Sequence, residues 1–272
     1  EMCIRDRPIT GRGGLQSGIY RIRGDVSSQY ISGLLFALPR LAGDSEIALT
    51  APLVSAGYVD MTLDTLARFG VRIEKTTGGF FVPGGQTYTP VCGYTAEGDW
   101  SNAGYFLAAG ALGGKVTVKG LSMDSRQRDR RLLDLLKAAG AVVTQDANGD
   151  ITVSGGNLRG ISFDGEDIPD ALPMLVAVLA TAAGESRITG AARLRLKESD
   201  RIAAMEAELR ACGGVLESEG GTITIHGCAD RLHAPAAPLH GYNDHRVVMS
   251  LAVLALAAGL EPVSYTHLRA HE

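Results

Sequence analysis

The sequence has few aromatic residues and no excess of positive charge. Aromatic side chains make up 6% of the 272 residues, and 26 Lys+Arg stand against 30 Asp+Glu, which gives a formal net charge of -4. A general nucleic-acid-binding surface is therefore disfavoured, although a local basic pocket stays open. Hydrophobic residues reach 45%, which is enough apolar side chain to bury a core and excludes disorder for the bulk of the chain.

Cysteines are also few, and long hydrophobic runs are missing. The four cysteines are scattered without a CxxC pair, which in a chain of this length indicates reduced thiols of a cytoplasmic protein. The longest apolar runs, 171–183 and 247–260, are too short or too interrupted to span a bilayer. A metal site is disfavoured because no compact ligand pair has the usual zinc spacing. The residues considered for it are His226, Cys228, His233 and His240.

Glycine is abundant, with 35 residues, and it punctuates an internal repeat. Three segments share an acidic start, an amphipathic helix, a glycine and a β-rich stretch. They begin at Asp60, Asp129 and Asp200, a period of about 70 residues. Glycines stand where each helix would need a C-cap with positive φ. These are Gly70, Gly140 and Gly213.

A second unit, a polar cluster followed by a helix rich in Ala, Leu and Gly, precedes each of these segments. Its copies begin at Gly24, Gly98, Asp167 and Tyr242. Such helices are apolar nearly all round, so we expect them to be buried. The alternation of both units predicts an α/β fold of repeated βαβαββ modules in two domains.

A turn-rich stretch places the domain junction at about residue 96. We therefore expect a partial first domain over 1–96 and a nearly complete second domain over 97–263. The ends 1–6 and 264–272 have no counterpart in the repeat, so we expect non-native sequence there.

The buried helices begin with polar residues that capping explains only in part. The starts are Ser27–Gln29, Asp170 and Asn243–Arg246. Ser, Asp and Asn cap helices, but Arg246 lies at the positive end of a helix dipole, where it is unfavourable by roughly 0.3–1 kcal/mol. A bound anion would reverse that sign.

The most charged segment, 193–201, supports the same interpretation. If a helix begins near Glu198 and Ser199, Lys197 and Arg201 lie close together, and such like charges repel unless an anion lies between them. A solvated surface face is the alternative. We favour a site for a polyanionic small molecule, in which the carboxylates of Asp170 and Glu198 lie among cations.

Five segments of the sequence resemble, in family order, the signatures of the 5-enolpyruvylshikimate-3-phosphate synthase family. They are Gly24–Gln29, Glu97–Ala111, Ile168–Leu175, Arg195–Ile202 and Gly241–Arg246. The resemblance runs from about Arg7 to Pro262 and implies two domains, each of three βαβαββ units, that form an inside-out α/β barrel pair. Six such modules would need roughly 420 residues, so we expect a fragment that is inactive alone.

The resemblance implies transfer of the enolpyruvyl group of phosphoenolpyruvate to the 5-hydroxyl of shikimate 3-phosphate, with release of phosphate. It implies a cytoplasmic monomer of aromatic amino acid biosynthesis that uses no metal and no organic cofactor, and that binds neither nucleic acid nor membrane. The implied catalytic residues are Asp170 as proton acceptor, Lys197 between the substrates, Glu198 for proton transfer at the methylene carbon, and His245 in support.

The resemblance also implies the binding residues. Those for shikimate 3-phosphate are Ser27, Ser28, Gln29, Ser55, Tyr58, Asp170, Arg193 and Lys197, and those for phosphoenolpyruvate are Gln29, Arg201 and Arg246. Arg193 departs from the family, which has Asn or another polar residue there. An expected arginine falls on Cys3. A lysine beyond Pro262 and a glycine-rich phosphoenolpyruvate loop are missing.

Three other functions compete with this interpretation. A UDP-N-acetylglucosamine enolpyruvyl transferase shares the chemistry, but the Lys-Glu-Ser-Asp-Arg run at 197–201 disfavours it. An RNA-end cyclase would need a nucleotide-linked histidine near its C-terminus, whereas His245 is expected at a helix start. A non-catalytic anion-binding module explains the repeats but not the carboxylates among the cations.

Overall fold

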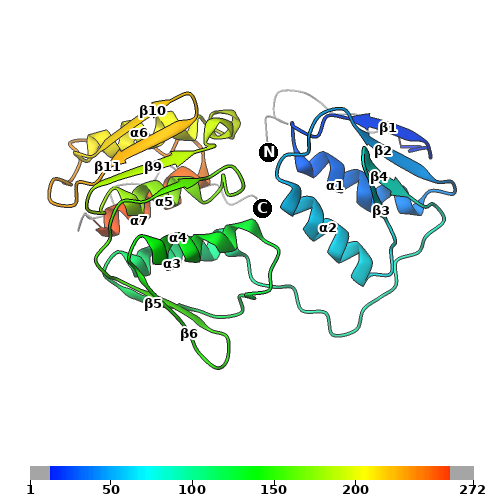
Figure 1. The fold of residues 1–272 in the computed structure, drawn as a ribbon, viewed down its shortest axis with the longest axis horizontal. Coiled ribbons are helices and arrows are strands. Elements are labelled where there is room, and N and C mark those ends of the chain that lie inside the picture. Colours follow the sequence, from blue (N-terminus) through cyan, green and yellow to red (C-terminus); the bar gives the residue numbers. More distant parts are fainter. Residues whose placement is uncertain (1–12, 258–272) are drawn as a thin grey trace. The chain divides into compact units, whose positions relative to one another are not determined.

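The computed structural model describes residues 13–257, and within them the chain forms two compact units (Figure 1). The first unit holds the residues up to Ala96 together with Arg126–Arg128. The second holds Glu97–Ser125 and the residues from Asp129 onward. Each unit combines helices with an open β-sheet or sheets, so the fold is mixed α/β.

The first unit has the element order βαβαββ that the repeats predict. Its elements are β1 Ile19–Ile22, α1 Ser28–Ala37, the short helix η2 Leu38–Arg40, β2 Ser45–Leu49, α2 Ala56–Arg68, β3 Glu74–Thr76 and β4 Gly79–Val82. The sheet order is β1-β2-β4-β3. Only β1 and β2 run parallel in it. Both helices pack on its apolar face through residues such as Ile31, Ile47 and Val59.

The parallel pair decides where both helices of this unit begin. Because β1 and β2 end at the same edge of the sheet, α1 and α2 start side by side there. The connecting loops touch backbone to backbone, since Val54 N donates to Gly24 O at 3.1 Å. A Cβ on Gly24 would lie 2.6 Å from the carbonyl oxygen of Ala51. Only glycine allows this approach.

The second unit contains two successive modules and a final helix, and in the first of these modules the described residues of the unit form no strand before α3. The first module comprises α3 Trp100–Ala111, β5 Lys115–Val118, η3 Arg128–Arg131, α4 Leu132–Ala138, β6 Val142–Gln145 and β7 Ile151–Ser154. The second comprises β8 Ser162–Asp164, α5 Leu172–Leu179, β9 Glu185–Thr189, η4 Ala192–Leu196, α6 Arg201–Ala211, β10 Val215–Glu219 and β11 Thr222–His226, followed by α7 His245–Ala257. The sheet orders are β5-β7-β6 and β10-β11-β9-β8.

The core of the second unit lies between its helices. α3, α5 and α7 pack against one another, and every residue of α5 is buried. This burial follows from the sequence of α5, which has no polar side chain and exposes no charged face. All sheets in the described residues are open, and none closes into a barrel.

Two details of the repeat differ from expectation. Of the three acidic starts, Asp200 caps a helix by accepting from Ala203 N at 3.0 Å. Asp60 lies inside α2 and pairs with Lys75 at 2.5 Å, because α2 begins earlier, at Ala56. Helix α1 is buried on one face only, and Phe36 is 44% exposed. The glycine C-caps are confirmed, with positive φ at all three positions.

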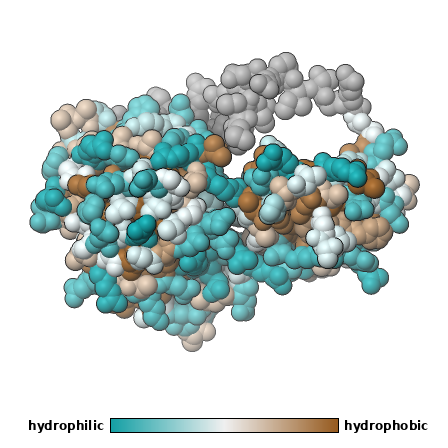
Figure 2. All heavy atoms as spheres, turned by 45° about the horizontal axis from the view of Figure 1, so that its top comes forward, coloured by the Kyte–Doolittle hydropathy of each residue, from teal (hydrophilic) through white to brown (hydrophobic). Residues whose placement is uncertain are grey.

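The surface mixes hydrophilic and hydrophobic residues over the face shown in Figure 2. Exposed large hydrophobic side chains occur on separate elements, for example Phe106 on α3 and Leu196 on η4. Within 13–257, no helix combines the length and the apolar character needed to cross a bilayer.

A core substitution in α5 tests this account of the second unit. Leu175 is 1% exposed, whereas Leu196 is 76% exposed. We expect Leu175→Ala to lower the free energy of unfolding by about 2–5 kcal/mol because it leaves a cavity, and Leu196→Ala to change it by about 0.5 kcal/mol or less. Urea unfolding followed by the fluorescence of Trp100, the single tryptophan, reports on this unit. Equal losses in the two variants would contradict the packing described.

Candidate functional site

A charged cluster lies where the parallel strands of the second unit end. β8 and β9 are parallel neighbours, so their carboxyl ends meet at one edge of the sheet. Asp170 follows β8 just before α5, and Lys197 follows β9 just before α6. The structure thereby brings together the charged residues expected to share a site, although they are far apart in sequence.

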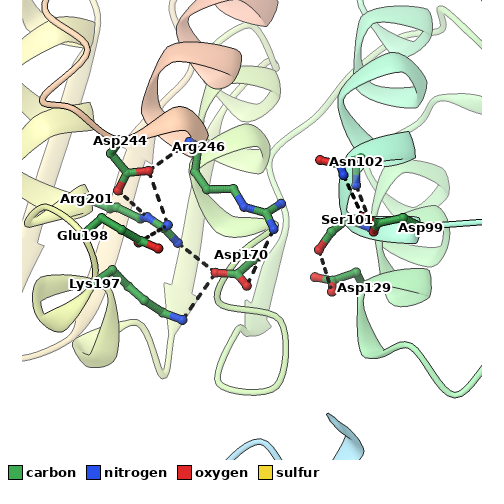
Figure 3. A network of polar contacts seen from close by, with 10 residues as sticks. All are labelled: Asp99, Ser101, Asn102, Asp129, Asp170, Lys197, Glu198, Arg201, Asp244 and Arg246. Atoms are coloured by element: carbon green, nitrogen blue, oxygen red, sulfur yellow. Dashed lines mark hydrogen bonds and ion pairs between the residues drawn. The ribbon is translucent and has the colours of Figure 1, made fainter. Parts of the chain in front are cut away.

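Arg201, the first residue of α6, is the centre of this cluster (Figure 3). Its side chain is 1% exposed and contacts three carboxylates. Nη1 lies 2.8 Å from Asp170 Oδ1, and Nη2 lies 2.5 Å from Glu198 Oε2. Nε lies 2.8 Å from Asp244 Oδ2. Burial alone would lower the pKa of Arg201, but these carboxylates outweigh it and raise the pKa.

Asp244 joins the start of α7 to α6. Its side chain is 0% exposed. Besides Arg201 it accepts from Ser199 Oγ at 3.0 Å and from Arg246 N at 2.9 Å. Burial would raise the pKa of Asp244, but the bonds from Arg201 and the other donors lower it. Asp244 is therefore a buried carboxylate whose acceptor positions are all used within the protein.

Asp170 is the carboxylate that all three cations of the cluster share. Lys197 Nζ lies 3.4 Å from its Oδ1, and Arg246 Nη2 lies 3.9 Å from its Oδ2. Burial would raise the pKa of Asp170, but Lys197, Arg246 and Arg201 together lower it. Asp170 is thus ionised at neutral pH, at 21% exposure of its side chain.

The cations differ in how many of their hydrogen-bond donors have partners within the protein. Arg201 has carboxylate partners on all three of its nitrogens. Lys197 and Arg246 contact Asp170 at longer distances, and within residues 13–257 Arg246 Nη1 is buried without a hydrogen-bond partner. Donors of this kind are available to an incoming anion.

The start of α3 contributes further polar groups that lie across from Asp170 (Figure 3). Asp99 caps α3 by accepting from Ser101 N at 2.8 Å, and Ser101 Oγ donates to Asp129 Oδ2 at 3.0 Å. Tyr105 of α3 is buried near Arg246. Burial raises the pKa of Tyr105 although Arg246 opposes it. Despite burial, the pKa of Arg246 is raised by Tyr105, Asp170 and Asp129.

Five of the predicted residues belong to the first unit. Ser27 caps α1 by accepting from Gln29 N at 3.3 Å, Ser28 is buried, and Gln29 is exposed. Ser55 precedes α2 in the left-handed region, with φ 53°, and Tyr58 lies in the first turn of α2. All of them stand at the edge where β1 and β2 end.

Two further predicted residues belong to the second unit. Arg193 lies in η4. His245 begins α7 with an exposed side chain. Within the described residues, no group of three or more His, Cys, Asp or Glu side chains could hold a metal ion.

Sequence reasoning missed the structural roles of Asp244 and Tyr105. Asp244 lies among the polar residues at the start of α7, but its partner Arg201 lies 43 residues away. Tyr105 belongs to an Ala-rich helix and carries no local signal of its proximity to Arg246. No pattern of spacing along the chain could have found either contact.

Comparisons with known proteins agree on one family. A family model described as EPSP synthase (3-phosphoshikimate 1-carboxyvinyltransferase) matches residues 5–269. Proteins named 3-phosphoshikimate 1-carboxyvinyltransferase from Clostridium kluyveri and Methanocaldococcus jannaschii are 40% and 37% identical to this chain, over 91% and 94% of its length. The matches cover 57% and 59% of those proteins, so the chain spans little more than half the length of these relatives.

Solved structures give the same result for the fold. An EPSP synthase from Acinetobacter baumannii superposes with a TM-score of 0.71 at 26% identity and covers 89% of this chain and 57% of its own. The enolpyruvyl transferase NikO from Streptomyces tendae superposes with a TM-score of 0.64 over 89% of this chain and 58% of its own. At 19% identity, it shows a shared fold.

Removing the central guanidinium should destabilise the protein in a pH-dependent way. Arg201→Met leaves Asp244 buried without its cation, which should cost about 3–5 kcal/mol at pH 7. In the unsubstituted protein the lowered pKa of Asp244 stabilises the fold at pH values above the ordinary aspartate pKa. This stabilisation is lost as the pH falls through the lowered pKa. In the variant the same pKa is raised, so the deficit should shrink toward pH 4. Urea unfolding at both pH values measures it.

The control for this substitution is Arg210→Met, which removes an arginine that is 69% exposed on the same helix. It should change the free energy of unfolding by less than about 1 kcal/mol. A deficit that is the same for Arg201→Met and Arg210→Met, or that does not change with pH, would contradict the assignment of Arg201 as the centre.

Proposed function

The chain belongs to the EPSP synthase (3-phosphoshikimate 1-carboxyvinyltransferase) family, and on this premise we propose that it serves the transfer of an enolpyruvyl group from phosphoenolpyruvate to the 5-hydroxyl of shikimate 3-phosphate, with release of phosphate. The observation that carries the proposal is the ion-pair cluster around Asp170. Both substrates are polyanions, and the cluster offers cations together with an ionised carboxylate. Positioned charges of this kind stabilise the charge that develops in a transition state.

In this proposal Asp170 accepts the proton of the attacking hydroxyl. Its lowered pKa makes it ionised but weakly basic while the cations are unoccupied. An anion bound to Lys197 and Arg246 neutralises part of their charge and so raises the pKa of Asp170. Substrate binding thereby increases the basicity of the group that must take the proton, which suits general base catalysis.

Glu198 has the complementary role of moving protons at the methylene carbon of phosphoenolpyruvate. Its side chain is 33% exposed, which makes it the most accessible carboxylate around Arg201. An anion that approaches Arg201 displaces Glu198 more readily than the buried Asp244. The displacement gives Arg201 an anion to bind and leaves the Glu198 carboxylate free for proton transfer, while Lys197 bridges the two substrates.

The first unit supplies the remaining groups for shikimate 3-phosphate. The starts of α1 and α2 lie together at one sheet edge, and helix N-termini with adjacent hydroxyls favour phosphate. The proposed binding residues there are Ser27, Ser28, Gln29, Ser55 and Tyr58. From the second unit Arg193 contacts the same substrate, and His245 supports the binding of phosphoenolpyruvate by the neighbouring Arg246. Gln29 also contacts phosphoenolpyruvate.

Several finer expectations about the fold, the domain bounds, the oligomeric state and the location belong to the same proposal. The modules form inside-out α/β barrels, and the domains are 1–96 and 97–263. The protein acts as a monomer in the cytoplasm and uses shikimate 3-phosphate and phosphoenolpyruvate without a cofactor. The free thiols of Cys92, Cys212 and Cys228 support a reducing compartment.

Direct binding measurements test the proposed substrates. We expect calorimetry to detect phosphoenolpyruvate binding to the chain and Arg246→Ala to weaken it by about tenfold or more, because a charge-assisted contact is lost. Arg210→Ala, which makes the same change of charge at an exposed site, should leave the affinity within about twofold. Equal weakening by both variants would show a general charge effect and refute the site. Preference for UDP-N-acetylglucosamine over shikimate 3-phosphate would refute the proposed substrate.

A substitution in the first unit tests how the two substrates are divided between residues. Ser28→Ala removes one hydroxyl and should weaken shikimate 3-phosphate binding by about 5- to 10-fold, with little effect on phosphoenolpyruvate. Ser162→Ala, on the exposed edge strand β8, is the control. Equal loss of affinity for both substrates would show that the assignment of Ser28 is wrong.

A further inference from the structure

The loop before α7 has a strained backbone at the point where it reaches the cluster. Tyr242 and Asn243 both have a φ of 53°, in the left-handed region. Residues with a Cβ seldom adopt this conformation, and two in succession persist only where the surroundings hold them. The next residues are Asp244 and Arg246, so this loop sets the start of α7 and both of its charged groups.

Glu208, in the third turn of α6, binds two residues of this loop through its carboxylate. It is 7% exposed and makes no ion pair with Arg201 or any other cation in the described residues. Its Oε2 accepts from His240 N at 2.9 Å, and its Oε1 accepts from Tyr242 Oη at 2.8 Å. Burial, and then Glu208, raise the pKa of Tyr242 to about 12, so Tyr242 stays protonated as a donor.

The loop also closes on itself around this carboxylate. His240 Nδ1 accepts from Tyr242 N at 3.0 Å. The rings of His240 and Tyr242 meet edge to face, with centroids 4.6 Å apart. Glu208 lies outside the loop and binds both residues, so it ties the loop to α6.

Helix α6 therefore contacts the loop at two points of one face. Arg201 and Glu208 are seven residues apart, which is two helical turns and places them on the same side. Arg201 binds Asp244, and Glu208 binds Tyr242, two residues earlier. The proposed function uses Arg201 but leaves Glu208 and Tyr242 without a role.

We propose that Glu208 and Tyr242 are positioning residues that hold the loop 240–244 on α6 and thereby set Arg246 for anion binding beside Asp170. This inference rests on the proposed function of Arg246. In residues 13–257 neither side chain forms a hydrogen bond or ion pair with the cluster, so both act through the backbone that leads to Asp244 and Arg246. Arg246 Nη2 lies 3.9 Å from Asp170 Oδ2. A small shift of the start of α7 would change this distance, so the position of the Arg246 side chain depends on the loop.

The test compares Tyr242→Phe, Glu208→Gln and Glu208→Ala in the full chain. Calorimetric titration with phosphoenolpyruvate should show affinity lowered about tenfold by Tyr242→Phe and by Glu208→Ala. Glu208→Gln keeps one acceptor oxygen and should lose less than Glu208→Ala. The control Glu206→Gln changes a partly exposed carboxylate of the same helix, which pairs with Arg210, and should stay within about twofold.

Hydrogen exchange at amides 240–246 gives a second readout that needs no ligand. In Tyr242→Phe the exchange should become faster there and stay unchanged in the β10–β11 hairpin. Because Tyr242→Phe keeps the ring, it serves if Glu208→Ala does not fold. Affinity within twofold of the unsubstituted chain in a folded variant would overturn the proposal, since a merely structural pair lowers stability without changing binding.

The outcome also separates this inference from the function on which it rests. If the unsubstituted chain does not bind phosphoenolpyruvate, the proposed function fails. The positioning role is then decided by exchange alone: faster exchange at 244–246 supports it, and unchanged exchange overturns it.

Discussion

The buried guanidinium of Arg201 is the constraint on which the second unit depends. A cation that is 1% exposed is stable only with carboxylates at hand, and here three different segments provide them. Asp170 comes from the start of α5, Glu198 from the turn before α6, and Asp244 from the start of α7. One side chain thus fixes the starts of three helices relative to one another, and the charged cluster is a consequence of that fixation.

In this arrangement one cation is fully paired within the protein, whereas two others keep hydrogen-bond donors for an incoming anion. The nitrogens of Arg201 are taken by carboxylates, whereas Lys197 and Arg246 make longer contacts and leave donor capacity. Asp170 stands between the two groups and remains ionised because the cations outweigh its burial. A site of this kind is prepared for an anion before it arrives, so little reorganisation is needed when charge develops.

The sequence allowed the architecture to be predicted because its signals are local and repeat. The βαβαββ order follows from hydrophobic periodicity, and the glycine C-caps with positive φ follow from helix geometry. The polar helix starts of Asp170 and Arg246 are local signals too. The partners of Asp244 and Glu208 could not be predicted, since each pair joins residues more than 30 positions apart through tertiary packing. The limited burial of α1 depends on its neighbours in the same way.

The cations of the cluster hold the pKa of Asp170 below its ordinary value until an anion neutralises part of their charge. A side-chain 13C titration of Asp170, free and with phosphoenolpyruvate, measures this directly. The account predicts a pKa below the ordinary aspartate value of about 3.9 in the free protein and a clear rise when phosphoenolpyruvate is bound. A pKa at or above the ordinary value in the free protein, or one that phosphoenolpyruvate leaves unchanged, would contradict it.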